Sequence, residues 1–348
     1  MKSLFLKSIV ISSLLVLIIG IWLLVDINNF RHAPLNIDEN GFRYEIKTGD
    51  TLTSLSRNLH EQNILDKPRY LTLLGKVRRV ASKIKTGEYL LEQGTTPEQL
   101  LNKIVKGATI QYSATIVEGL NFREMMAALK ENENLEHTLN GQKPAAIMAL
   151  IGKPGEHYEG RFLPDTYHFP RGTTDVDFLK RAYSAMETLL AQEWEQRQEG
   201  LPYKNAYEAL IMASIVEKET AVPSERNAIA GVFVRRLKKR MRLQTDPTVI
   251  YGLGEKFDGN IRRRDLLNDT PYNTYRRHGL PPTPIAMPSV EAIKAALHPD
   301  DGDSLYFVAR GDGSHEFSST LEQHNNAVIK YQLKGRKRPF SSMPAGRK

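Results

Sequence analysis

The feature that most constrains this chain is an uncharged, apolar run over residues 8–25, rich in Ile, Leu and Val. As a helix this run would extend roughly 27 Å, close to the thickness of the hydrocarbon core of a bilayer. Lys2 and Lys7 precede it, Asp26 follows it, and Trp22 lies near its far end. This arrangement predicts a single transmembrane anchor with its N-terminus in the cytoplasm and the rest of the chain outside.

A cleaved signal peptide is the alternative interpretation of the same run. The small-residue cleavage site of such a peptide is missing, because residues 23–26 (LLVD) offer none. The sequence therefore favours an uncleaved anchor. Asn, His and Pro residues accumulate up to Pro34, which predicts a short tether after the anchor.

Beyond the tether, strand and helix patterns alternate, which predicts an α+β fold. Residues 42–46 alternate like a strand, residues 47–50 (KTGD) form a turn, and Leu52 and Leu59 mark the apolar face of a following helix. A strand at 87–91 would close this small α/β module. The strand, the Gly-Asp-Thr-Leu turn and the helix resemble a LysM-like module, a small peptidoglycan-binding fold. A module that serves only for packing is the alternative.

The longer remainder of the chain predicts a second α+β unit. Strand patterns occur at 109–117, 305–309 and 315–318, the last two as a β-hairpin. A helix begins near Tyr207 and must end before Pro223, because proline cannot continue it. Residues 279–285 (GLPPTPI) contain three prolines, which predict a stiff, extended wall suited to a groove.

A carboxylate near the end of the helix from Tyr207 is the strongest candidate for chemistry. Counting back three and four residues from Glu217 reaches Ser214 and Ala213, so Glu217 stands over small side chains on one helical face. Apolar residues form a band beside that face. The negative end of the helix dipole and an apolar rim both raise the pKa of a glutamate, as a general acid near neutral pH requires. Glu219 projects in a different direction.

Residue patterns alone leave ordinary structural roles open. The alternative for Glu217 is a solvated carboxylate at a helix end. Residues 155–167 are dense in functional residue types, but their spacing indicates a solvated loop. Six basic residues within 235–242 can attract an anionic partner, although a solvated helix face is the more ordinary interpretation. Asp246 before Pro247 fits a helix N-cap as well as a substrate contact.

Several longer blocks occur together and in one order. They are EGRFLPDTY at 159–167, SIVEKET at 214–220, QTDPTVIY at 244–251, YNTY at 272–275 and GLPPTPI at 279–285. This set resembles the endolytic murein transglycosylases, the MltG/YceG-like family of membrane-anchored lytic transglycosylases. The resemblance covers most of the chain, and chance explains it poorly because each block is several residues long.

In that family the first Glu of the SIVEKET block is the catalytic residue, and it falls on Glu217. The resemblance implies that Glu217 protonates the glycosidic oxygen between N-acetylmuramic acid and N-acetylglucosamine. It then accepts the proton of the 6-hydroxyl of the same muramic residue, which closes a 1,6-anhydro ring without water. One carboxylate therefore suffices, where glycoside hydrolases usually use two. Gln244, Asp246, Asn273 and Tyr275 are the candidates to hold sugar hydroxyls and acetamido groups.

The resemblance also implies a domain order and a cellular setting. The expected parts are a cytoplasmic N-terminus (1–7), a transmembrane anchor (8–25), a tether (26–41), a LysM-like module (42–108), a YceG-like catalytic domain (109–336) and a basic tail (337–348). We expect the protein in the cell inner membrane with its catalytic domain in the periplasm. Its implied partners are glycan strands of peptidoglycan, nascent ones in cell-wall assembly, together with the membrane and peptidoglycan synthases.

Other chemistries find little support in the sequence. The nine His residues are scattered without a metal-binding pair, and no Gly-rich phosphate loop or Gly-x-Ser-x-Gly turn occurs. The absence of Cys excludes a thiol nucleophile and a disulfide scaffold. We expect no metal and no cofactor. A non-catalytic, membrane-anchored peptidoglycan-binding protein is the main alternative. A nucleic-acid binder is a weaker one, because aromatic residues are not interleaved with the basic run at 235–242.

Overall fold

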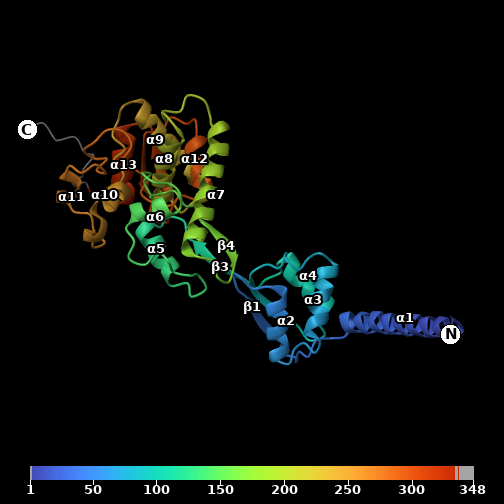
Figure 1. The fold of residues 1–348 in the computed structure, drawn as a ribbon. Coiled ribbons are helices and arrows are strands. Elements are labelled where there is room, and N and C mark those ends of the chain that lie inside the picture. Colours follow the sequence, from blue (N-terminus) through green and yellow to red (C-terminus); the bar gives the residue numbers. More distant parts are fainter. Residues whose placement is uncertain (1, 334–335, 337–348) are drawn as a thin grey trace, which may run out of the picture. The chain divides into compact units, whose positions relative to one another are not determined.

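A computed structural model of the protein describes residues 2–333 and 336, with side chains from Val10 onward. The expected basic tail at 337–348 and the side chains before Val10 lie outside the described residues. The chain divides into two compact units. Unit 1 comprises Met1–Tyr112 and His168–Gly172, and unit 2 comprises Ser113–Tyr167 and Thr173–Lys348. Helices and short two-stranded sheets occur together, so the expected mixture of helix and strand is confirmed (Figure 1).

Unit 1 begins with a long apolar helix, which a compact group of strands and helices follows. Its elements are α1 (Lys2–His32), β1 (Phe42–Ile46), α2 (Leu52–Glu61), α3 (Pro68–Val77), β2 (Gly87–Leu91) and α4 (Pro97–Lys106). β1 and β2 pair antiparallel along their whole lengths. Thr51 and Thr96 begin α2 and α4 with capping boxes, in which side chains satisfy the first free backbone groups of each helix.

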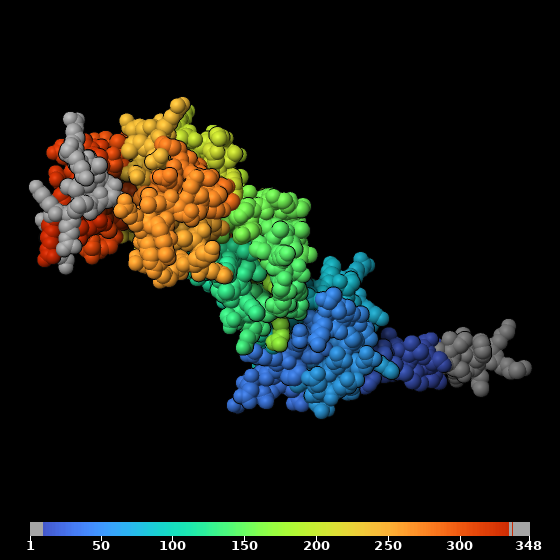
Figure 2. All heavy atoms as spheres, turned by 90° about the vertical axis from the view of Figure 1, so that its left-hand side faces the viewer, coloured from blue at the N-terminus to red at the C-terminus, as the bar shows by residue number. Residues whose placement is uncertain are grey.

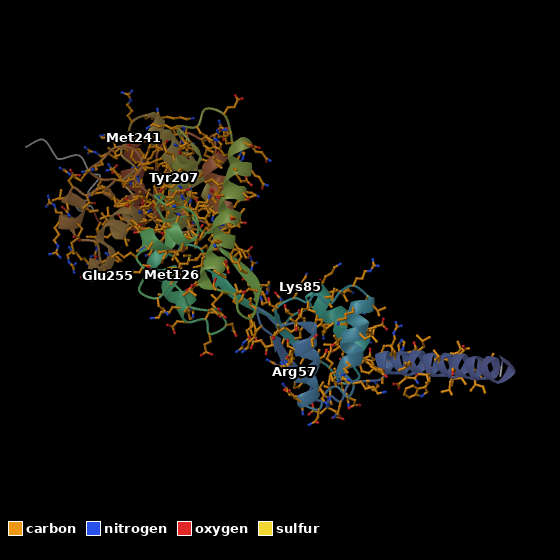
Figure 3. The ribbon with its side chains drawn as sticks, in the orientation of Figure 1. Arg57, Lys85, Met126, Tyr207, Met241 and Glu255 are labelled. Carbon is orange, nitrogen blue, oxygen red and sulfur yellow. The ribbon has the colours of Figure 1, made fainter. Side chains whose placement is uncertain are left out.

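Among the described helices, α1 alone is long and apolar enough to cross a membrane. Its side chains between Val10 and Val25 point outward into open space, with only Gly20 less exposed (Figures 2 and 3). The apolar character of α1 therefore does not arise from packing inside the protein. By length and composition, α1 is a candidate membrane span or signal sequence.

Residues 26–32, expected as the start of a tether, continue α1 instead. Phe30 is buried in the core of unit 1 and meets Tyr70 edge to face, with ring centroids 5.5 Å apart. Leu35 and Ile37 of the following segment are buried as well. The polar composition of residues 26–41 indicated a short tether, but Phe30, Leu35 and Ile37 of this segment pack into the core of unit 1.

Unit 2 is built mostly from helices. Its elements after β3 (Gln111–Ile116) are α5 (Phe122–Lys130), α6 (Pro144–Leu150), β4 (Asp165–Pro170), α7 (Asp175–Glu195), α8 (Ala206–Glu219), η1 (Pro223–Glu225), α9 (Arg226–Lys238), α10 (Asp246–Leu253), η2 (Gly254–Lys256), α11 (Arg263–Leu267), α12 (Val290–Leu297), β5 (Tyr306–Ala309), β6 (His315–Ser318) and α13 (Leu321–Tyr331). β3 pairs with β4, and the chain passes from one unit to the other within each of these strands. The expected hairpin is confirmed as the antiparallel pair β5 and β6.

α8 forms the centre of unit 2, because every side chain from 209 to 216 is buried. It packs against α12, α9 and α7. Asn205 caps its start by accepting a hydrogen bond from the N–H of Glu208 at 3.0 Å. Pro223 begins the following short helix, η1. The helix expected from near Tyr207 to a point before Pro223 is therefore confirmed.

The basic run at 235–242 is not a uniformly solvated face. Arg235 donates to the backbone carbonyl of Ser304 at 2.8 Å, and Arg236, only 8% exposed, donates to that of Leu305 at 2.7 Å. Both carbonyls lie just before β5, so these two cations attach the hairpin to α9. The interpretation of the run as solvated is wrong for these two residues.

Candidate active site

Glu217 lies near the end of α8, half-buried, with one carboxylate oxygen held by Ser289. The backbone N–H of Ser289 donates to Oε2 of Glu217 at 3.0 Å, and the hydroxyl of Ser289 donates to the same oxygen. Ser289 is also the N-cap of α12, where its Oγ accepts from the N–H of Ala292 at 3.2 Å. One serine therefore links the carboxylate of Glu217 to the N-terminus of α12.

This contact places Oε2 of Glu217 at the N-terminus of α12, although the residue itself belongs to the last turn of α8. Ser289 is 72 residues away from Glu217 in the chain, so no local sequence pattern predicted this contact. No donor from the described residues contacts Oε1 of Glu217, which leaves that oxygen for a ligand.

The stretch before Ser289 runs along the same face of α8. Ser214 accepts a hydrogen bond from the N–H of Ile285 at 3.0 Å and donates to the carbonyl of Ile211 at 2.7 Å. Ser214 and Glu217 thus share one helical face, as their spacing predicts. The expected proline-rich wall at 279–285 forms neither helix nor strand, and Ile285 at its end lines the pocket described below.

Gly119 borders Glu217 on another side. Its N–H donates to the carbonyl of Met287 at 2.9 Å, and Nζ of Lys218 donates to the carbonyl of Gly119 at 3.0 Å. Gly119 has φ +76°, a conformation that favours glycine. A Cβ added there would lie 4.0 Å from Cγ of Glu217. Gly119 therefore borders the Glu217 side chain on the side where Lys218 holds its carbonyl group.

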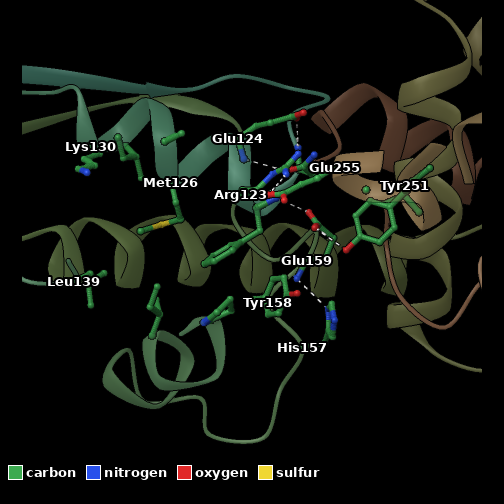
Figure 4. Close-up of a pocket in the computed structure, with 18 of the residues that line it drawn as sticks. Arg123, Glu124, Met126, Lys130, Leu139, His157, Tyr158, Glu159, Tyr251 and Glu255 are labelled. Atoms are coloured by element: carbon green, nitrogen blue, oxygen red, sulfur yellow. Dashed lines mark hydrogen bonds and ion pairs between the residues drawn. The ribbon is translucent and has the colours of Figure 1, made fainter. Parts of the chain in front are cut away.

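A pocket of about 1200 Å³ opens beside this point. Gly119 and Lys218 form part of its wall, although Glu217 itself does not. The rest of the wall comes mainly from α5, residues 137–147, the loop at 157–159, α10 and η2 (Figure 4). Glu217 therefore lies at the border of the pocket rather than inside it.

Glu159 is a deeply buried carboxylate of this pocket, with 2% of its surface exposed. The N–H of Phe122 donates to its Oε1 and the hydroxyl of Tyr251 to its Oε2, each at 2.9 Å (Figure 4). Burial raises the pKa of Glu159 to about 7, and the hydrogen bonds offset only part of that effect. The interpretation of residues 155–167 as a solvated loop is therefore wrong at this position. The EGRFLPDTY block, dense in functional residue types, was the signal in the sequence, but its spacing did not indicate burial.

Glu219 faces a different partner from Glu217, as the helical spacing predicts. The hydroxyl of Thr245 donates to its carboxylate. Burial raises the pKa of Glu219 to about 7, and the nearby charge of Asp246 adds to the rise. Part of the residue's surface stays exposed, but its carboxyl group is enclosed. The last turn of α8 thus carries two carboxylates in different surroundings.

Three of the predicted substrate contacts lie near Glu219. Gln244 and Asp246 are exposed on either side of Thr245, and the hydroxyl of Tyr275 donates to Oδ1 of Asp246 at 2.6 Å. The expected N-cap role of Asp246 is not observed, because Thr245 holds the N-cap position and Asp246 is the first residue of α10. None of these side chains belongs to the pocket wall.

Asn273, the fourth predicted contact, is 1% exposed. Its Nδ2 donates to the carbonyls of Asp265, Leu266 and Asn268, and its Oδ1 accepts from the N–H of Tyr275 at 3.0 Å. The amide is therefore occupied by the protein's own backbone. This arrangement fits a residue that positions Tyr275 better than one that touches a ligand.

Among residues 2–333 and 336, no group of three His, Asp or Glu side chains is arranged to hold a metal ion. Of the carboxyl groups described above, Glu159 lies in the pocket wall and Glu217 at its border. A carboxyl group is a common general acid or base.

Known proteins match the chain over most of its length. A profile of the YceG-like family matches residues 44–330. A Bacillus subtilis (strain 168) protein named endolytic murein transglycosylase is 31% identical over 308 residues, which cover 82% of this chain and 83% of that protein. A Streptococcus pneumoniae protein of the same name is 27% identical over 335 residues. The match covers 85% of this chain and 60% of the Streptococcus pneumoniae protein. The 2.6 Å crystal structure of a YceG-like protein from Listeria monocytogenes has a TM-score of 0.51 and 28% identity, and the match covers 83% of this chain and 99% of that one.

Proposed function

Because this chain belongs to the YceG-like family, we propose that it is a lytic transglycosylase that cuts peptidoglycan strands internally. The name of the Bacillus subtilis relative, matched over more than four-fifths of both chains, supports this activity. The observation that carries the assignment to a residue is the setting of Glu217. Its carboxylate is half-buried at the border of a large pocket, with Oε2 held by Ser289 and Oε1 left for a ligand.

In the proposed reaction, Glu217 is general acid first and general base second. It donates a proton to the glycosidic oxygen between N-acetylmuramic acid and N-acetylglucosamine while the bond from that oxygen to C1 breaks. The carboxylate so formed accepts the proton of the 6-hydroxyl of the same muramic residue, whose oxygen bonds to C1. The product has a 1,6-anhydromuramic end, no water is consumed, and Glu217 regains its proton.

Ser289 supports both halves of this reaction. Its two donors stabilise the carboxylate that exists between the proton transfers, and they hold the group so that Oε1 faces the ligand. Both donors belong to the cap of α12, a helix packed directly on α8. The acid is therefore oriented by a rigid element rather than by a loop.

We propose substrate contacts at two places near Glu217, the end of α8 and the pocket wall. Gln244, Asp246 and Tyr275 present polar atoms near the end of α8 and are proposed to bind sugar hydroxyls and acetamido groups. Asn273 is proposed to act through Tyr275, whose backbone N–H it holds. A glycan strand also suits the pocket wall, because tyrosine rings there offer apolar faces beside a few polar groups. These rings belong to Tyr158, Tyr251 and Tyr272.

We further propose that α1 is an uncleaved anchor in the inner membrane, with the rest of the protein in the periplasm beside nascent strands and a synthase. Its exposed apolar surface and the packing of its end into unit 1 support an anchor. We also propose that residues 42–108 form a LysM-like, peptidoglycan-binding module. The closure of this module by antiparallel pairing of β1 with β2, as expected from the sequence, supports that proposal.

Replacement of one carboxylate tests the assignment directly. Glu217→Gln keeps the volume of the side chain but cannot donate and recover a proton. We expect release of anhydro-muropeptides from purified peptidoglycan, measured by mass spectrometry, to fall at least about a hundredfold. Glu219→Gln is the matched control, because it lies on the same helix and should lose much less.

Other outcomes of this experiment point elsewhere. Equal losses in the two variants, or near-original release by Glu217→Gln, would reject the assignment. If Glu159→Gln lost the release of anhydro-muropeptides while Glu217→Gln retained it, the catalytic acid would be Glu159 in the pocket wall. Reducing ends in place of anhydro ends would leave a glycosidase but reject the mechanism. Peptidoglycan binding without any product from the unaltered protein would favour the non-catalytic alternative.

A further inference from the structure

α3 begins at the level where the apolar run of α1 ends. Asp26, the first charged residue after that run, accepts hydrogen bonds from Nζ of Lys67 at 2.7 Å and from the hydroxyl of Tyr70 at 2.8 Å. Lys67 is the N-cap residue of α3 and Tyr70 lies in its first turn. If α1 spans a bilayer, the start of α3 lies in the polar interface, just outside the hydrocarbon.

The other end of α3 is tied to α1 at a similar height. Arg31 of α1 pairs with Glu98 at 2.8 Å, and Arg78, directly after α3, contacts the same carboxylate at 3.8 Å. Asp26 and Arg31 are five residues apart, about 7.5 Å along the axis of α1. Both ends of α3 are therefore attached within a short length of α1, and α3 lies across it (Figure 1).

The buried face of α3 packs on α2. It carries Leu71, Leu74 and Gly75, and a Cβ added to Gly75 would clash with Leu52 of α2 at 2.1 Å. Within unit 1, α2 lies on one side of α3 and α1 extends away on the other (Figure 1). The opposite face of α3 is consequently the one turned toward the side from which α1 projects.

That opposite face combines apolar and basic side chains. Leu73 and Val77 are 43% and 73% exposed, and Arg69 and Lys76 are exposed beside them at helical spacing. Residues 67–85 include no Asp or Glu and seven cations, namely Lys67, Arg69, Lys76, Arg78, Arg79, Lys83 and Lys85. Exposed apolar residues flanked by cations are typical of a helix that lies in the headgroup region of a membrane.

We infer that this surface, the α3 face defined by Arg69, Leu73, Lys76 and Val77, docks onto anionic phospholipid headgroups beside α1. Leu73 and Val77 enter the boundary between headgroups and acyl chains, while Arg69 and Lys76 bind lipid phosphates. The inference rests on the proposed anchor and adds a second, lateral contact with the membrane. Docking fixes the height and tilt of unit 1 at the membrane surface, where the sequence indicated only a short tether after the anchor.

The chain contains no Cys, so a single introduced cysteine can be labelled alone. Val77→Cys carries a nitrobenzoxadiazole fluorophore on the α3 face, and Thr53→Cys, exposed on α2, is the matched control. The full-length protein is reconstituted in nanodiscs of phosphatidylcholine with or without phosphatidylglycerol. Quenching of the fluorophore by doxyl-labelled lipid then reports contact with the acyl chains.

We expect strong quenching at position 77 in discs with phosphatidylglycerol, weaker quenching without it, and little at position 53. Each surface cation changes the docking equilibrium by about fivefold. Reversal of both charges in the Val77→Cys protein, by Arg69→Glu with Lys76→Glu, should therefore remove the docked state.

Equal quenching at the two positions would overturn the inference, as would quenching at 77 that ignores both phosphatidylglycerol and charge reversal. A blue-shifted fluorophore that lipid does not quench would show that position 77 packs against protein, and would also overturn the docking. Protein that fails to enter discs would overturn the anchor and the docking together. Protein held in discs with position 77 unquenched would overturn the docking alone.

Discussion

Glu159→Gln should make unit 2 more stable at high pH and leave its stability almost unchanged at low pH. Glu159 is 2% exposed, and its carboxyl group accepts hydrogen bonds from the N–H of Phe122 and the hydroxyl of Tyr251. A glutamine can still accept from the Phe122 N–H, and it offers an amide donor toward the Tyr251 oxygen. The substitution therefore removes the ionisation while it keeps the size and the hydrogen-bonding positions of the side chain.

The size of this gain in stability follows from the pKa of Glu159. Burial raises the pKa of Glu159 from its ordinary 4.5 to about 7, so the folded protein binds this proton more tightly than the unfolded chain does. The stabilisation by the bound proton is complete below pH 4.5 and is lost as the pH rises toward about 7. At about 1.4 kcal/mol for each pKa unit, the loss amounts to roughly 3 kcal/mol. Above pH 7, we therefore expect the free energy of unfolding of Glu159→Gln to be higher than that of the parent protein by up to this amount.

Urea unfolding between pH 4.5 and pH 8 measures this difference. The chain has two Trp residues, Trp22 in α1 and Trp194 in α7. In a Trp22→Phe background, the fluorescence of Trp194 follows unit 2 alone, because this side chain packs against the core around α8. Glu199→Gln, at an exposed turn, controls for the loss of one negative charge.

If the free energy of unfolding differs between Glu159→Gln and its parent by the same amount at pH 4.5 and pH 8, Glu159 is not a carboxyl group kept neutral by burial. The same conclusion would follow if Glu199→Gln showed an equal pH-dependent gain, because the effect would then be one of net charge.

Ser289→Ala removes the side-chain cap of α12 and one donor to Glu217, so we expect unit 2 to lose about 1 kcal/mol in urea unfolding and release of anhydro-muropeptides to slow, whereas Ser289→Thr should restore both. Equal stability and activity in the alanine variant would show that the backbone N–H alone holds Glu217. For the topology, a periplasm-dependent reporter fused after Lys348 should be active and a cytoplasm-dependent one silent, and the reverse result would invert the proposed orientation.

Local patterns in the sequence were sufficient for most elements around the site. Helical spacing separated Glu217 from Glu219, and in the structure they contact Ser289 and Thr245 respectively. A helix start near Tyr207 was recognisable, and so were the strands that close the small module of unit 1 and those of the C-terminal hairpin. These features depend on neighbours within a few residues, which is the range over which backbone preferences and side-chain periodicity operate.

The polar surroundings of the site were not predictable from such patterns. Glu159 sits in a run of polar and turn-forming residues, yet Phe122 and Tyr251, 37 and 92 residues away, enclose it. Arg236 belongs to a basic run typical of a solvated face. Its side chain is nevertheless buried, because it donates a hydrogen bond to the carbonyl of Leu305, just before β5. Periodicity shows which face of an element is polar, and it does not show what covers that face.

The sequence by itself therefore determined the apolar length of α1, the helix that carries Glu217, and the block order that resembles the YceG-like family. The tertiary structure alone decided that α1 continues through residues 26–32 with Phe30 in the core of unit 1, that Glu159 is buried, and that Ser289 holds Glu217. The physical reason is the same in each case. Burial and hydrogen bonding of a charged or polar group depend on segments far away in the chain, whereas helix and strand formation depend mainly on adjacent residues.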